Sequence, residues 1–135
     1  MRAARIALLA GALIAAAWFA LGASQSDEIN TVTSMLASSS HLSSAQASRA
    51  DGLLSSAGLL NPDRNVTLLR GQVALQAGHV AEAQRLIGQV TSAEPDNIDA
   101  WDETAHAYGG NVRIAQHAYA ELARLDPLIL KRPAR

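Results

Sequence analysis

The sequence has 135 residues, no cysteine and a formal net charge of −1. A chain without cysteine can form no disulfide, no thiolate metal site and no cysteine nucleophile, and a charge near zero gives no electrostatic basis for nucleic-acid binding. Aromatic residues make up only 4%, which favours an all-α fold of closely packed helices over a β-sandwich rich in aromatic and β-branched runs.

Residues 1–23 have the pattern of an export segment. Arg2 and Arg5 precede an uncharged run over residues 6–23, and the first acidic residues follow at Asp27 and Glu28. As a helix the run would reach about 27 Å, close to the ~30 Å of a bilayer core. The run is therefore interpreted as a signal-anchor with a cytoplasmic N-terminus, or as a signal peptide that is cut near its end and leaves a secreted or periplasmic protein.

Residues 26–60 predict a first helix pair in spite of their many serines. Ser26 followed by two acidic residues is typical of a helix start, and the serines at 38–40 are predicted to form the turn. Ser43 and Gln46 match a capping box with Leu42 as the staple residue before it. Apolar residues recur at helical spacing in both helices: Ile29, Val32 and Leu36 in the first, and Ala47, Ala50, Leu54 and Ala57 in the second.

Four further helices follow, and each has a clear stop signal. They are expected over about 62–77, 80–93, 98–108 and 112–125, ended by Gly78, Pro95, Gly109-Gly110 and Pro127 respectively. No stretch reads as a strand.

Prolines in the turns between helix pairs repeat at a nearly constant interval. Pro62, Pro95 and Pro127 are separated by 95 − 62 = 33 and 127 − 95 = 32 residues. A period near 34 residues that holds two helices and a proline turn is the tetratricopeptide pattern. Residues 64–127 therefore resemble two tetratricopeptide repeats. The residues that carry the resemblance are Gly71, Gly78, Ala83 and Pro95 in one unit and Trp101, Ala105, Tyr108, Ala115, Tyr119 and Pro127 in the next.

The resemblance implies an α-solenoid of about three helix pairs, over 26–60, 64–95 and 98–127, within a helical domain over 24–130. Small residues would allow two helices to approach closely, and Trp101, Tyr108 and Tyr119 would fill gaps between successive helices. The first helix of each repeat would line a concave groove that displays Asn65, Leu68, Gln72, Gln76, Asp99, Asp102 and His106. Such a groove, rich in amides and acids, favours a neutral or basic protein segment as partner.

No catalytic motif or phosphate loop occurs in the sequence, so no enzymatic activity and no cofactor are expected. Asp99, Asp102 and His106 share one helix face, which leaves a metal-binding role, or a carbohydrate-binding role with Trp101, as the alternative.

The expected function is a protein-binding scaffold at the extracytoplasmic face of a membrane. By resemblance to small anchored repeat proteins of bacterial type, it would assist assembly of an envelope or secretion complex. A homo-oligomer is compatible with this scheme, and residues 131–135 form a basic tail.

Overall fold

The computed structural model describes residues 26–60 and 64–128. This part of the chain is helical throughout and contains no strand, which confirms the all-α class. Residues 26–38 form the first described helix, and five more follow it: α2 (Ser44–Leu60), α3 (Arg64–Gln76), α4 (Val80–Ala93), α5 (Ile98–Ala107) and α6 (Val112–Leu125).

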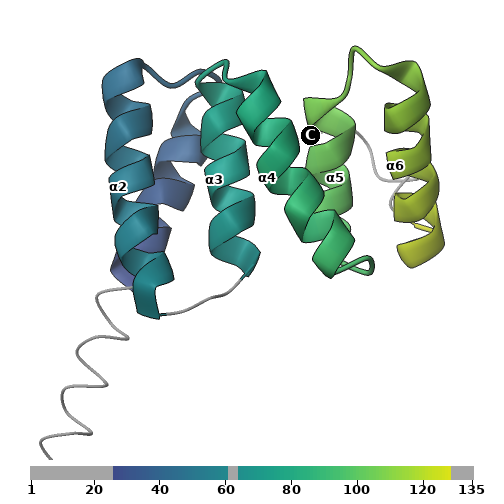
Figure 1. Cartoon of the computed structure of the whole chain (residues 1–135), viewed down its shortest axis with the longest axis horizontal. Coiled ribbons are helices and arrows are strands. Elements are labelled where there is room, and N and C mark those ends of the chain that lie inside the picture. The colour runs from purple at the N-terminus through teal and green to yellow at the C-terminus, as the bar shows by residue number, and fades with distance from the viewer. Residues whose placement is uncertain (1–25, 61–63, 129–135) are drawn as a thin grey trace, which may run out of the picture.

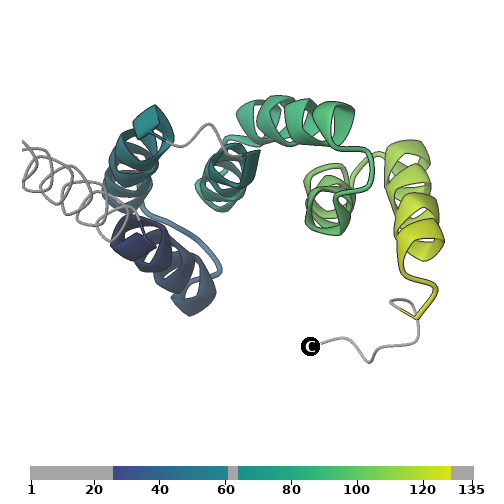
Figure 2. The ribbon, with the colours of Figure 1, turned by 90° about the horizontal axis from the view of Figure 1, so that it is seen from below.

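Successive helices lie side by side in pairs, and the pairs form a curved row (Figure 1). Seen from below in Figure 2, α2, α4 and α6 form the outer row of an arch, and residues 26–38, α3 and α5 form the inner row. No helix in the described ranges is long and apolar enough to span a bilayer. The predicted membrane segment over 1–23 and the basic tail over 131–135 lie outside the described residues.

The ends of the helices follow local signals in the sequence. The Ser43 amide donates to Gln46 Oε1 at 2.9 Å, and the Gln46 amide donates to Ser43 Oγ at 3.3 Å. This pair is the predicted capping box, and Leu42 before it is buried. Ser26 is the first described residue and is helical, and the predicted start of this helix lies at the edge of the described residues.

Gly78 ends α3 as predicted, with a positive φ of 81°. The His79 amide donates to the carbonyl of Ala74 at 2.8 Å, and the Gly78 amide donates to that of Leu75 at 3.0 Å. These two bonds define a Schellman motif, which needs a left-handed residue at this position. Asn97 and Asn111 cap α5 and α6 by accepting bonds from the amides of Ala100 and Ile114.

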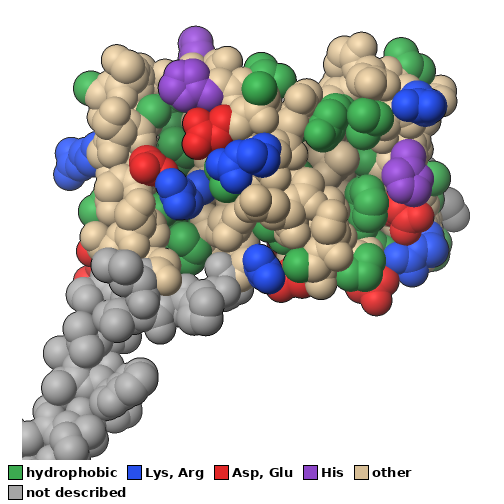
Figure 3. All heavy atoms as spheres, viewed as in Figure 1, with side chains coloured by type: hydrophobic (Ala, Val, Ile, Leu, Met, Phe, Trp, Pro, Cys, Tyr) green, Lys and Arg blue, Asp and Glu red, His purple; other side chains and the backbone are tan. Residues whose placement is uncertain are grey.

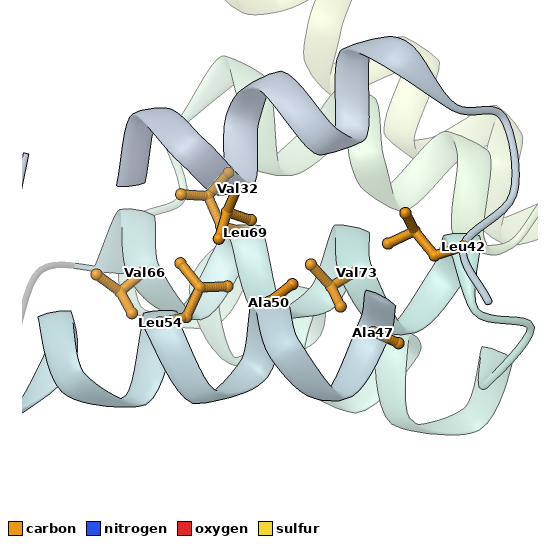
Figure 4. Close-up of a cluster of buried hydrophobic side chains, with 8 residues drawn as sticks. All are labelled: Val32, Leu42, Ala47, Ala50, Leu54, Val66, Leu69 and Val73. Carbon is orange, nitrogen blue, oxygen red and sulfur yellow. The ribbon is translucent and has the colours of Figure 1, made fainter. Parts of the chain in front are cut away.

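Two apolar clusters join the helices from residues 26–38 through α5. The first joins the helix of residues 26–38, α2 and α3 (Figure 4) and consists of Val32, Leu42, Ala47, Ala50, Leu54, Val66, Leu69 and Val73. The second joins α3, α4 and α5 and consists of Leu68, Ala74, Ala83, Ile87, Val90, Ala100 and Ala107. α3 contributes to both clusters, so it is the helix through which the first pair and the rest of the molecule are packed together.

Small residues occur where helices meet, as expected. A Cβ atom added at Gly71 would lie only 2.7 Å from Cγ1 of Ile87 on α4, so a larger residue does not fit without a shift. Ala83 is fully buried and Ala105 is nearly so, whereas Ala115 is half-buried.

The aromatic positions divide into two kinds. Trp101 and Tyr108 are half-buried, and Tyr108 packs against the second cluster. Tyr119, however, is 47% exposed and does not fill a gap between helices. It lies on α6, the last described helix, and no further described helix covers that side.

Candidate binding groove

A hollow on the concave side of the arch is lined by all three helices of the inner row. Its lining residues are Thr33, Leu36 and Ala37 from the first described helix, Gln72, Leu75 and Gln76 from α3, and Glu103 and His106 from α5. We call this hollow the inner groove. Because each inner helix contributes to it, its shape depends on the relative placement of the three helix pairs.

Three of the seven predicted groove residues, Gln72, Gln76 and His106, line this hollow. Leu68 does not belong to it, because this side chain is only 3% exposed and is packed in the second apolar cluster. Other helices pack against α3 on more than one side. Leu68 therefore points into the core, whereas the same position on a helix with fewer neighbours would face the groove. Asn65, Asp99 and Asp102 lie outside the lining: the first two are exposed, and Asp102 is half-buried.

Glu103 and Gln72 connect α5 to α3 across the groove. The Gln72 amide Nε2 donates to Glu103 Oε1 at 2.8 Å. Burial raises the pKa of Glu103 above its ordinary value of 4.5, against the opposing effects of the Gln72 hydrogen bond and of His106, while Asp102 and Asp99 raise the pKa further. The groove therefore contains a half-buried carboxyl group whose charged form is disfavoured by its surroundings.

Sequence reasoning missed Glu103 as a groove residue, although a signal was present. Glu103 lies three residues after Ala100 and four before Ala107, and both alanines are buried. On a helix this spacing places Glu103 on the packed face rather than on the solvated one.

Gln76 lies where the first pair meets α3. Its Nε2 donates to the carbonyl of Leu36 at 3.3 Å, and its own main-chain oxygen accepts from the Leu42 amide at 3.0 Å and also contacts His41 Nδ1. The side-chain Oε1 is buried without a hydrogen-bond partner among the described residues. The amide thus has an unused acceptor in the wall of the groove.

Three potential metal-ligating groups lie close together on α5. Ligand atoms of Asp102, Glu103 and His106 are within 4.8 Å of one another, and His106 Nδ1 is 4.0 Å from Asp102 Oδ2. Asp99, which the sequence grouped with Asp102 and His106, is not a member of this cluster. Exposed acidic groups in the first half of a helix are also favoured by its dipole, without any ion.

Trp101 has a structural environment. Its indole Nε1 donates to the carbonyl of Pro95 at 2.8 Å, and its ring meets that of His117 edge-on with centroids 5.4 Å apart. The Trp101 side chain therefore connects α5 to the turn before it and to α6, which agrees with the expected packing role. These contacts give no support to a carbohydrate-binding role for the ring.

The convex face has a second hollow, between α2 and α4 and above α3. Asp51 and Arg70 form an ion pair there at 2.8 Å, with His79 and Glu82 also in the lining. Figure 3 shows this face, where acidic and basic side chains are interspersed over α2–α4. A mixed surface of this kind favours no ligand charge, in contrast to the inner groove, whose lining contains Glu103 and no lysine or arginine.

Comparisons of this chain with protein-family models, with curated proteins and with solved structures found no match. The helix pairs and the geometry of the inner groove are therefore the features of this chain that bear on its function.

Proposed function

We propose that this chain is a non-enzymatic scaffold of the tetratricopeptide type that holds a protein segment in its inner groove. The observation that carries the proposal is the hollow itself, which is lined by one helix from each of three successive pairs. A segment bound there would contact the whole inner row at once, which is how repeat proteins use their concave surfaces.

The chemistry of the groove favours a neutral or basic segment. Leu36 and Leu75 offer apolar contacts, Gln72 and Gln76 offer amide groups, and Glu103 offers a carboxylate. An acidic segment would meet this carboxylate without any lysine or arginine in the lining to compensate, and like charges in contact oppose binding.

The setting that the sequence supports is the extracytoplasmic face of a membrane. Residues 6–23 would anchor the chain with its N-terminus in the cytoplasm, or would be removed after export, and the helical domain would then assist assembly of an envelope or secretion complex. Two arginines before the apolar run and two acids after it support this orientation.

Crosslinking followed by affinity capture from membranes, with a tag on the chain, tests the proposal. Glu103→Lys reverses a charge inside the groove, and Glu82→Lys makes the same change at an exposed position on α4. We expect the first variant to lose the captured partner and the second to retain it. Capture of the same proteins by both variants would contradict a role for the groove.

Calorimetric titration with divalent ions and with short glycans separates this function from the metal- or carbohydrate-binding alternative. For a scaffold we expect no saturable heat from either class of ligand. Saturable binding that is lost in Asp102→Ala would favour the alternative, because Asp102 belongs to the carboxylate and imidazole cluster of α5.

A further inference from the structure

α5 carries three acidic residues, of which Glu103 lines the inner groove and the other two lie outside its lining, and the same chain has a segment of opposite charge. Asp99, Asp102 and Glu103 lie on α5. Residues 129–135, with the sequence Ile-Leu-Lys-Arg-Pro-Ala-Arg, carry three cations and no acid. A cation beside Glu103 would favour its charged form, which burial otherwise disfavours.

The helix that precedes this segment, α6, ends close to the start of α5. Arg124, in the last turn of α6, has its Nη2 2.9 Å from Asp96 Oδ1 and 3.5 Å from the carbonyl oxygen of Pro95. The end of α6 therefore lies beside the start of α5.

The segment is also long enough to follow α5. α5 has ten residues, so it is about 15 Å long at ~1.5 Å per residue. Residues 129–135 number seven, and an extended chain of that length spans about 23–25 Å. From the end of α6, beside the start of α5, a segment of this length is long enough to follow α5 as far as His106.

We propose that residues 129–135 bind along α5 and occupy the inner groove of their own chain. A short tether gives an effective concentration in the millimolar range, so even a weak contact is enough to fill the groove. An external partner must then displace the segment. The apparent affinity of the chain for that partner is the intrinsic affinity multiplied by the fraction of molecules whose groove is open. The inference rests on the groove of the proposed function and adds a built-in competitor to it.

Disulfide trapping tests the proposal, because the sequence has no cysteine of its own. In the full chain, His106→Cys with Ala134→Cys pairs the exposed end of the groove with the segment, and Ser92→Cys with Ala134→Cys is the matched control on α4, in the outer row. In a thiol redox buffer we expect an intrachain disulfide in the first variant, at least tenfold above the control, because bridging requires Cα atoms within about 7 Å.

If the proposal is right, electrostatic attraction between the basic residues of the segment and the acidic residues of α5 stabilises the bound state. We expect the disulfide yield to fall to the control level when Lys131, Arg132 and Arg135 are replaced by Gln, or in 1 M salt, where the screening length is ~3 Å. Equal trapping in both cysteine pairs, or trapping that is insensitive to both changes, would overturn the proposal. Disulfides that join two chains would also overturn it, since they would place the segment on a second copy.

The capture experiment with Glu103→Lys distinguishes this failure from failure of the proposed function. If the segment is absent from the groove but Glu103→Lys still abolishes partner capture, the scaffold function stands and only the built-in competitor is removed. If both are correct, the triple Gln variant captures more partner than the unmodified chain.

Discussion

At the scale of single residues, the bond between Gln72 and Glu103 is the contact that most defines the groove. It joins two inner helices through side chains at 2.8 Å, and one of its partners is a carboxyl group disfavoured in its charged form by burial. A group of this kind makes stability depend on pH, since its proton affinity differs between the folded and unfolded chains.

The pKa of Glu103 is raised in the folded chain, so between the unfolded and the folded pKa values the native state binds more protons than the unfolded state. The free energy of unfolding therefore falls as pH rises through that window, from about 4.5 upward, and levels off above it. We expect Glu103→Gln to remove this dependence while keeping a hydrogen bond to Gln72. Chemical unfolding of both chains across pH measures it, and parallel curves would contradict the environment assigned to Glu103.

Gly71 and Gly52 give a matched pair of glycine substitutions. In Gly71→Ala the new methyl group would collide with Ile87, whose side chain is fully buried and cannot move freely, so overpacking costs about 1–3 kcal/mol. The gain in helix propensity, about 0.5–1 kcal/mol, offsets only part of this. Gly52→Ala on α2 meets nothing within 4 Å and should show the gain alone.

Thermal unfolding measures the difference, because in a domain of this size each kcal/mol shifts Tm by about 4–8 °C. We expect Gly71→Ala to melt below the unmodified chain and Gly52→Ala above it. A Gly71→Ala variant that is as stable as Gly52→Ala would show that α3 and α4 are not in close contact at this residue.

At the scale of helices, sequence signals predict the boundaries well because the signals are local. α4 and α6 have the predicted limits, and α3 and α5 end within one residue of theirs. The capping box at Ser43 and the left-handed Gly78 need only a few neighbouring residues to form, so no knowledge of the tertiary fold is required.

The orientation of individual side chains was less predictable, because it depends on which neighbours a helix has. Leu68 was expected in the groove and is buried, since α3 packs against helices on more than one side. Tyr119 was expected in a gap and is exposed, since α6 has no described helix beyond it. For the same reason the sequence did not predict Glu103 as a groove residue. Glu103 contacts α3 because the fold brings α5 beside that helix.

The capping box provides a test at this scale. Ser43→Ala leaves the Gln46 amide, in the first turn of α2, without its side-chain acceptor, and we expect a loss of about 1 kcal/mol together with faster amide exchange in that turn. Ser55→Ala, at an exposed interior position of the same helix, should be neutral or slightly stabilising because alanine is the better helix former. Equal effects of the two substitutions would argue against Ser43 as the cap.

At the scale of the whole molecule, we expect the two ends of the arch to differ in local stability, and the first helix pair to be the less stable part. The first described helix contains several hydroxyl side chains that bond back to carbonyls of the preceding turn, such as Thr31 to Asp27 and Thr33 to Ile29. Such bonds satisfy the hydroxyl groups but slightly weaken a helix. The serine-rich pair over 26–60 therefore depends more on the first cluster than on its own helical propensity.

We expect native-state hydrogen exchange to show lower protection over 26–60 than over α3 and α4, since regions with weaker packing open at lower free energy. Leu54→Ala, at a fully buried position of the first cluster, should cost about 2–5 kcal/mol and raise exchange mainly over 26–60. Leu122→Ala on α6 is the matched change at the other end and should leave the first pair protected. Uniform exchange along the chain would mean that the arch unfolds as a single unit.

Gln76 lines the inner groove with its side chain and connects to the first helix pair through its main chain. Its carbonyl oxygen accepts a hydrogen bond from the Leu42 amide and contacts the His41 ring. A ligand that moved the first helix pair away from α3 would break this hydrogen bond as well as contacts of the first apolar cluster. We expect the Leu42 amide to exchange faster in that state, before any helix unfolds.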